Sequence, residues 1–199
     1  MKCIPLLILI AAMSGCVGPG REPLNNAAAL NSNETIIVGR IELLPALAKG
    51  EQKIKSLNSG LFENKVIIIA DEKYREINRE LAIGDYEGRI EATLGENFFV
   101  RSSNRPFFIL LGMMYLELGG KTTNQIYFPG GFKVSVKADD KAVYIGTIQY
   151  TRDEFFSFTK ITVVDDYERA NAEFKKKFGP KLQLRKSLII LPKQDQSTR

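Results

Sequence analysis

The chain has 199 residues, of which 44% are hydrophobic and 26% are charged, and its formal net charge is +5. These values are ordinary for a globular protein of one domain and exclude collagen-like, coiled-coil and wholly disordered chains. The sequence contains no His and no Trp, and its two cysteines are Cys3 and Cys16. The missing residues exclude a Ser-His-Asp or Cys-His nucleophile system and a His-Cys zinc site in the body of the chain.

Residues 1–15 have the pattern of a bacterial signal peptide. Lys2 precedes a mostly apolar run over residues 4–13, which is shorter than the roughly 20 residues of a membrane-spanning helix. A Ser-Gly pair then stands directly before Cys16, which resembles the bacterial lipobox, where the cysteine becomes the first mature residue and carries lipid such as palmitate. Val17 replaces the Asp that commonly retains lipoproteins in the inner membrane. We therefore predict lipidation at Cys16 and an outer-membrane location.

Two alternatives exist for this N-terminus, namely an ordinary secretory signal cut after a small residue and a buried N-terminal helix. Residues 16–34 are rich in Gly, Pro, Asn and Ala and lack an apolar period, so we predict a flexible linker there. In the alternative, residues 27–30 begin a short helix that packs on the domain. Residues 35–199 are predicted to form one domain, and this domain contains no cysteine.

From residue 35 onward, short runs rich in β-branched and aromatic residues alternate with turn residues. Many short strands at such spacing predict a mainly-β fold, either a β-sandwich or a barrel. The runs are residues 35–44, 66–70, 89–94, 97–101, 106–118, 125–128, 132–137, 143–151, 158–164 and 187–191.

Two neighbouring runs predict a β-hairpin. Apolar and polar side chains alternate over residues 132–137, an Ala-Asp-Asp-Lys turn follows, and residues 143–151 resume the apolar pattern. The second strand is apolar on both faces, so we expect it to lie in the centre of its sheet. Asp139 and Asp140 also suggest a calcium loop, but the third acid and the glycine of EF-hand spacing are missing, which favours a plain turn.

Residues 166–178 predict the one clear helix, which carries an apolar stripe at positions i, i+3, i+7 and i+11. The stripe consists of Tyr167, Ala170, Phe174 and Phe178. Asp165 or Asp166 can cap the first turn, three lysines at 175–177 oppose the negative end of the helix dipole, and a Gly-Pro pair ends it. We expect the stripe to pack on the sandwich and the lysines to lie in solvent. The alternative is that the lysines form a patch for anionic lipid or nucleic acid.

Four other segments have weaker patterns. Residues 71–81 fit a short helix or a polar hairpin arm equally well, and residues 46–61 fit a loop or one weak helix. The pairs Gly119-Gly120 and Gly130-Gly131 lack the strand-loop-helix setting and the Lys of a phosphate loop. We predict that both glycine pairs are turns.

Paired carboxylates are the acid-base groups that remain in a chain without His. The candidate pairs are Asp153-Glu154, Asp165-Asp166, and Glu91 with Glu96. The second pair already suits helix capping, and the first stands beside Arg152 in a predicted surface turn. We therefore predict no catalytic residue, and we expect no metal, no cofactor and no nucleic-acid partner.

Aromatic residues are numerous, with 12 Phe and 7 Tyr, and many are adjacent in the chain. In a strand, adjacent side chains point to opposite faces, so one member of each pair is expected to point away from the core. Either these rings are exposed and form a binding surface, or a helix, loop or second sheet covers them. The pairs are Phe98-Phe99, Phe107-Phe108, Tyr127-Phe128 and Phe155-Phe156.

Three segments resemble bacterial lipoproteins with a carboxypeptidase regulatory-like β-sandwich: TIIVGRIEL (35–43), FKVSVKADDKAVYIGTI (132–148) and ITVVDDYERANAEFKKKFG (161–179). The resemblance implies a prealbumin-like β-sandwich with a lipid-anchored, exported location, and it carries over no catalytic residue. Together with the helix pattern, it predicts a β-sandwich with one C-terminal amphipathic helix packed on it.

Three classes of function follow from these observations. The first is a non-catalytic lipoprotein of the bacterial envelope, which acts through contacts with protein or cell wall and is attached to the membrane through Cys16. The second is a module that binds carbohydrate or lipid through exposed aromatic side chains. The third, which is the weakest, is a carboxylate-based hydrolase.

Overall fold

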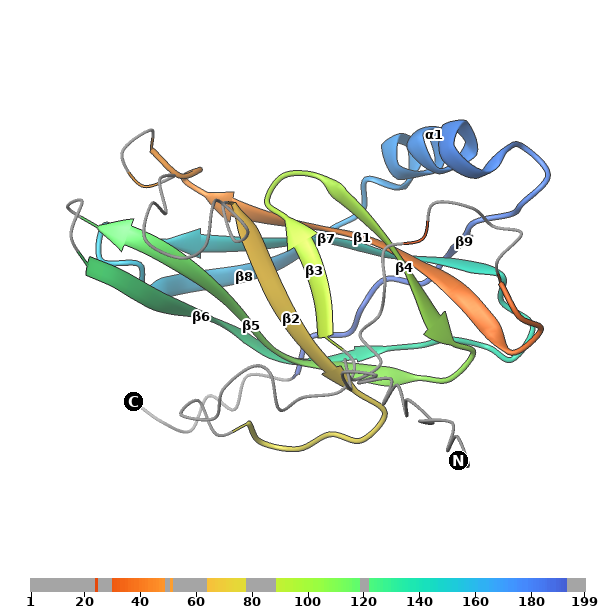
Figure 1. The fold of residues 1–199 in the computed structure, drawn as a ribbon, viewed down its shortest axis with the longest axis horizontal. Coiled ribbons are helices and arrows are strands. Elements are labelled where there is room, and N and C mark those ends of the chain that lie inside the picture. Colours follow the sequence, from red (N-terminus) through yellow and green to blue (C-terminus); the bar gives the residue numbers. More distant parts are fainter. Residues whose placement is uncertain are drawn as a thin grey trace, which may run out of the picture.

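The computed structural model describes Leu24, Glu51 and residues 30–48, 64–77, 89–118 and 122–192. Most of these residues lie in strands, and one helix follows near the C-terminus (Figure 1). The predicted mainly-β sandwich with a single C-terminal helix is confirmed. In chain order the elements are β1 (Glu34–Leu44), β2 (Lys65–Asp71), β3 (Arg89–Thr93), β4 (Asn97–Ser103), β5 (Phe107–Leu118), β6 (Thr122–Val134), β7 (Ala142–Arg152), β8 (Phe158–Val164), α1 (Tyr167–Phe178) and β9 (Arg185–Lys186).

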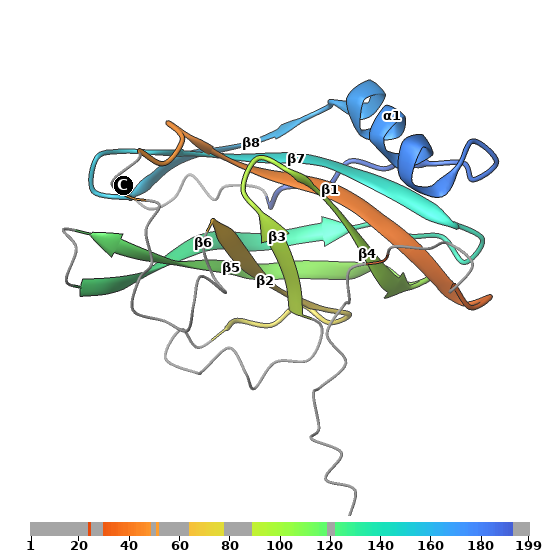
Figure 2. The same cartoon turned by 45° about the horizontal axis from the view of Figure 1, so that its top comes forward.

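The strands form two sheets that lie one above the other (Figure 2). The sheet beside the helix has the order β4-β1-β7-β8, and β9 pairs with β7 next to β8. The second sheet has the order β3-β2-β5-β6. β1 and β9 run parallel to β7, whereas the other pairings are antiparallel. The turn from β3 to β4 therefore connects the edge strands of the two sheets.

The predicted hairpin of residues 132–137 and 143–151 is wrong. Residues 132–134 end β6, which pairs with β5, whereas β7 pairs with β1, β8 and β9 in the other sheet. Alternation identifies the buried face of a strand, but it contains no information about which strand lies beside it. The expectation that the second strand is central is confirmed, because β7 has partners on both edges.

The space between the sheets is filled by aliphatic and aromatic side chains. Phe128 of β6 is fully buried, and its ring lies edge-on to Tyr150 of β7 with 4.9 Å between centroids. The Tyr150 hydroxyl donates a hydrogen bond of 2.8 Å to the Pro129 carbonyl. This bond ties the two sheets together and satisfies the one polar atom of a buried ring.

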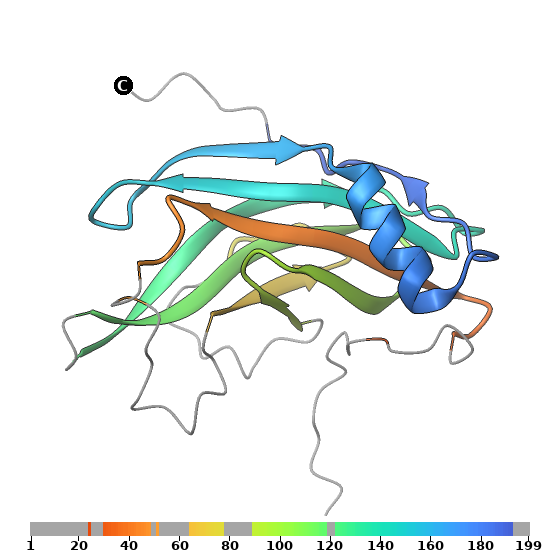
Figure 3. The ribbon, with the colours of Figure 1, turned by 90° about the horizontal axis from the view of Figure 1, so that it is seen from above.

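The helix α1 lies across the outer face of the sheet that contains β1 and β7 (Figure 3). Phe174 is fully buried there in a cluster that includes Ile36, Val38 and Tyr144. Lysines 175–177 are exposed, as predicted. Of the two predicted capping residues, Asp165 accepts a hydrogen bond from the first helical N–H at 3.2 Å, while the residue after it makes no capping bond with its side chain.

The N-terminal segment is attached to the domain before β1 begins. Leu24 is buried at 6% exposure, and its N–H donates a hydrogen bond of 2.9 Å to the Phe99 carbonyl. Leu30 is half-buried against the same cluster that holds α1. The predicted flexible linker over residues 16–34 is therefore wrong at these two leucines, because apolar side chains in a polar segment still gain free energy from burial.

Three of the weaker segments are partly described. Residues 72–77 form neither a helix nor a strand, and residues 46–48 form a loop. Gly130 and Gly131 do not form a turn but lie inside β6, where the pairing register with β5 shifts. A Cβ on Gly130 would lie 2.2 Å from the carbonyl oxygen of Leu110, so the close approach of the two backbones requires glycine.

Several predictions lie outside the described residues. These are the signal peptide over residues 1–15, lipidation at Cys16 and the Gly119-Gly120 turn. Within the described part of the chain, α1 is too short and too polar to span a membrane.

Candidate functional site

The turn between β3 and β4 lies where the edges of the two sheets meet. Leu94 donates its N–H to the carbonyl of Asn64 at 2.8 Å, and Gly95 donates its N–H to the carbonyl of Ile41 at 2.8 Å. Gly95 has φ +76°, a left-handed conformation that favours glycine. The turn is thus bonded to both the β1 and the β2 sides of the sandwich, and it separates two hollows on the surface.

The first hollow has a volume of about 390 Å³ and lies between the end of β1 and the β3–β4 turn. Four of its ten described lining residues are leucines, and one of these, Leu44, is 41% exposed. The lining residues are Glu42, Leu43, Leu44, Ala46, Leu47, Asn64, Thr93, Leu94, Gly95 and Glu96. Such a surface suits an apolar group with a polar end.

The second hollow has a volume of about 230 Å³ and lies on the other side of the same turn. It brings together Glu91 and Glu96, one of the carboxylate pairs named from the sequence, with Lys65, Lys177 and the half-buried ring of Phe99. Lys65 and Glu91 form an ion pair of 3.6 Å. The Phe99 ring is partly covered by Phe178 and by the Nζ of Lys177, so the charged groups around its open part suit a polar group such as a sugar hydroxyl or a lipid headgroup.

The other two carboxylate pairs stabilise local structure. Asp153 accepts hydrogen bonds from the N–H groups of Phe155 and Ser157 at 2.9 and 2.8 Å, which closes the turn between β7 and β8. Asp165 forms an ion pair with Lys186 at 2.8 Å, and this bond lowers the pKa of its carboxyl below the ordinary value. A general acid needs a raised pKa, so the contact with Lys186 does not prepare Asp165 for acid catalysis.

A buried arginine fastens the loop after β1. The Arg152 side chain is 5% exposed and donates to both carboxylate oxygens of Glu51 at 3.1 and 2.8 Å. It also donates to the Pro45 carbonyl at 3.2 Å and lies over the Phe156 ring. Burial alone would raise the pKa of Glu51, but hydrogen bonds from Arg152 and the Ala48 N–H lower it below the ordinary value.

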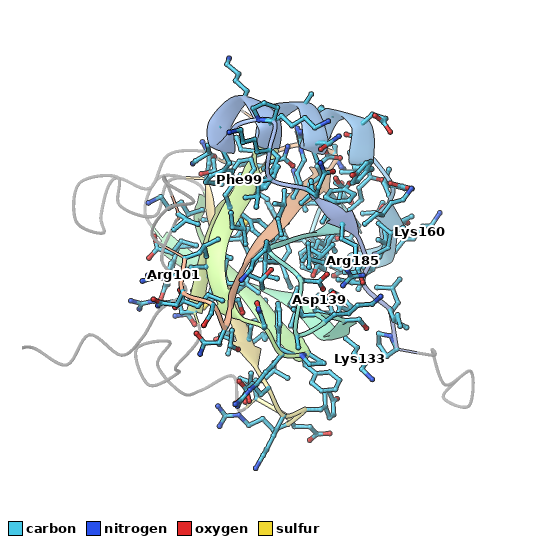
Figure 4. The ribbon with its side chains drawn as sticks, turned by 90° about the vertical axis from the view of Figure 1, so that its right-hand side faces the viewer. Phe99, Arg101, Lys133, Asp139, Lys160 and Arg185 are labelled. Atoms are coloured by element: carbon cyan, nitrogen blue, oxygen red, sulfur yellow. The ribbon has the colours of Figure 1, made fainter. Side chains whose placement is uncertain are left out.

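A second ion pair fastens the crossover from β6 to β7. Asp140 is buried at 7% exposure, and both of its carboxylate oxygens accept hydrogen bonds from Arg185 of β9. One of these oxygens also accepts the Lys137 N–H at 2.7 Å. Burial would raise the pKa of Asp140, but the bonds from Arg185 and Lys137 hold it below the ordinary value. Figure 4 shows Arg185 near Asp139, the other acid of this turn.

The sequence interpretation of Asp139 and Asp140 as a turn did not identify the ion pair with Arg185. The partners are 45 residues apart and no local pattern links them. Because the Asp140 carboxylate already has three donors, the calcium alternative gains no support from its geometry. The described residues contain no group of three His, Cys, Asp or Glu side chains suited to a metal.

Each of the four aromatic pairs has one buried ring, and three of the pairs lie in strands. The buried rings are Phe98, Phe107, Phe128 and Phe156. Of the partners, Phe99 is covered by Phe178 of α1 at 5.6 Å between centroids, and Phe108 is covered by Tyr74 at 5.7 Å. Phe155 is 79% exposed at the β7–β8 turn. Covering elements thus account for Phe99 and Phe108. Tyr127 is half-buried and donates a hydrogen bond of 2.7 Å to Gln125, and Phe155 is left as an exposed ring.

Comparison with known proteins adds no information about the site. No protein-family model, no curated protein and no solved structure matches this chain significantly.

Proposed function

We propose that this protein is a non-catalytic lipoprotein of the bacterial outer membrane, anchored through Cys16, that acts through contacts with protein or cell wall. The observation that carries the proposal is the short apolar segment that ends in Ser-Gly directly before Cys16. The resemblance of three segments to lipoproteins with a carboxypeptidase regulatory-like domain supports the same location.

Three of the described carboxylates stabilise the fold through contacts with basic side chains. The carboxyl groups of Glu51, Asp140 and Asp165 have pKa values below the ordinary range because arginine or lysine donates hydrogen bonds to each. Each of these bonds joins segments that are distant in the sequence. These three carboxylates therefore hold distant segments of the domain together, whereas the acid of a glycosidase needs a carboxyl group with a raised pKa.

The anchor is tested by replacing each cysteine in the full chain, expressed in a Gram-negative host with labelled palmitate. Cys16→Ser is expected to abolish palmitate labelling and release the protein from the outer-membrane fraction. Cys3→Ser is the matched control, because Cys3 lies inside the predicted signal peptide and is removed with it. Labelling that persists in Cys16→Ser, or retention of that variant in membranes at high salt, would refute the anchor.

A second candidate function is the binding of a glycan or lipid headgroup in the 230 Å³ hollow, where Phe99 lies beside charged residues of both signs. We expect Glu96→Gln to weaken sedimentation of the protein with purified cell wall, because Glu96 lines both hollows. Glu154→Gln, an exposed acid outside them, is the control. Equal sedimentation of the two variants would remove this candidate, and release of sugar fragments by the wild type would favour the hydrolase instead.

A further inference from the structure

The C-terminal end of α1 and the loop after it form a basic cluster, which consists of Lys175, Lys176, Lys177 and Lys181. All four side chains are exposed, and the sequence has no acid from residue 174 to residue 181. The nearest acid on the helix, Glu173, accepts a hydrogen bond of 2.8 Å from Asn97. Four positive charges on one end of an element create a local positive potential that attracts anionic surfaces.

The N-terminal segment joins the domain next to this basic cluster. The N–H of Leu24 donates to the carbonyl of Phe99, and the Phe99 ring contacts Phe178 in the last turn of α1. The Nζ of Lys177 lies 4.9 Å from the centroid of the Phe99 ring. Figure 4 shows Phe99 directly beneath α1. Leu24 and the lysines therefore share one region of the surface.

The length of chain between Cys16 and Leu24 limits how the domain can stand on a membrane. Eight residue steps extend to at most about 26–29 Å, and a flexible chain of that length has a typical reach of about 14–17 Å. A compact domain of this size has a diameter of about 40 Å. A lipid at Cys16 therefore keeps the region around Leu24 close to the bilayer, and the opposite end of the domain cannot reach it.

We propose that the basic cluster faces the membrane and binds the anionic headgroups of its phospholipids, so that the lipid anchor and the lysines together fix the orientation of the domain. This inference rests on the proposed anchor at Cys16 for the position of the domain, and on charge complementarity for the contact. A lysine near an anionic bilayer strengthens binding about fivefold, and the effect decays within a Debye length of about 8 Å. The typical reach of the tether, about 14–17 Å, allows the cluster to approach the bilayer to within that distance.

The first test measures the lysines without the anchor. The full chain with Cys16→Ser is mixed with vesicles of phosphatidylcholine and phosphatidylglycerol at low salt, and the bound fraction is measured by flotation. Changing Lys175, Lys176 and Lys177 together to Gln is expected to lower partition about a hundredfold, which is three factors of five. The matched control changes Lys133, Lys137 and Lys160 to Gln, because these three are also exposed and the change in net charge is identical.

The second test measures orientation in the lipidated protein. Its predicted mature chain has no free thiol, so a cysteine introduced at Ala172 or at Ser157 carries a fluorophore alone. Ala172 is exposed on α1 one turn before the basic cluster, whereas Ser157 is exposed at the β7–β8 turn, far from α1 (Figure 1). A quencher on the lipid headgroup is expected to quench the label at position 172 at least twofold more than the label at 157, and high salt should reduce this difference.

The outcomes separate this inference from the proposed function. Equal partition of the two triple-lysine variants, or equal quenching at positions 172 and 157, would overturn the inference while leaving the anchor intact. Failure of the Cys16-containing protein to incorporate lipid would refute the anchor, and the flotation of the unlipidated chain would still decide whether the lysines bind anionic headgroups.

Discussion

Phe174→Ala tests whether α1 is part of the folded domain. The Phe174 ring is fully buried between α1 and the sheet, in a cluster that includes Ile36, Val38 and Tyr144. Truncation of a buried Phe to Ala typically costs about 3–5 kcal/mol because it loses apolar burial and leaves a cavity. The exposed Lys176 lies two residues away, and Lys176→Ala is expected to change stability by no more than about 0.5 kcal/mol.

Urea denaturation of residues 17–199, followed by circular dichroism, measures the difference. With a slope of about 2 kcal/mol per molar urea, a loss of 3–5 kcal/mol lowers the midpoint by about 1.5–2.5 M. The Lys176→Ala midpoint should remain close to that of the wild type. Small and equal losses for both variants would refute the reasoning, because α1 would then contribute little to the folded state and its apolar stripe would be available to a partner or to the membrane.

Three further predictions concern an ion pair, a glycine and the N-terminal attachment. The folded-state pKa of Asp140 is lowered, so the carboxylate stabilises the fold above its ordinary pKa of 3.8, and this stabilisation is lost as the pH falls below that value. Between pH 5 and about pH 2, the free energy of unfolding measured with urea should therefore fall more in the wild type than in Asp140→Asn. Gly130→Ala should destabilise by about 3 kcal/mol or more, because its Cβ would meet a backbone oxygen at 2.2 Å. Gly179→Ala has open space around its Cβ but a backbone conformation (φ 87°, ψ 164°) that favours glycine, so it should cost about 1–3 kcal/mol. Leu24→Ala should lower the thermal midpoint by several degrees, whereas Leu44→Ala, at an exposed position, should lower it less.

Most strands and the helix were predictable because their signals are local. Two strand predictions were wrong: the run 187–191 forms only an isolated bridge at Ile190, and the runs 125–128 and 132–137 both overlap the single strand β6. β7 is apolar on both faces, and its central place in the sheet follows from that pattern. The apolar stripe of α1 recurs with the helical period, and the structure places Ala170 and Phe174 against the sheet. Each of these features depends on side chains within about a dozen residues, so a single sequence contains the necessary information.

Strand pairing was not predictable in the same way. β6 and β7 are neighbours in the chain and alternate correctly, yet residues 135–141 cross from one sheet to the other. Which strand pairs with β6 depends on whether its free energy is lower in a long pairing with β5 or in a short hairpin with β7. β6 pairs with β5 from Phe107↔Val134 to Leu118↔Thr122, so the long pairing is the more stable one. No local pattern in residues 132–151 indicates which of the two pairings is more stable.

The candidate site was partly predictable. Glu91 and Glu96 were identified as a pair because they are close in the sequence, and they do line one hollow. The contributions of Lys65 and Lys177 depend on the meeting of two sheets and α1, which the spacing of residues does not specify. Phe99 was identified as a member of an aromatic pair, but the ring that covers it, Phe178, comes from an element about 80 residues later in the chain.

Two arginines, the buried Arg152 and the half-buried Arg185, explain how a domain without disulfides can hold its long connections. Arg152 ends β7 and binds Glu51, which fixes the loop after β1, while Arg185 in β9 binds Asp140 and fixes the crossover between the sheets. Each arginine also donates to backbone carbonyls, at Pro45 and Ser135 respectively. A planar guanidinium can make these bonds at fixed angles to several acceptors at once, which the ammonium of a lysine cannot. The ion pairs therefore specify where the loops lie, a role that burial of apolar side chains alone does not fulfil because hydrophobic contact has no preferred direction.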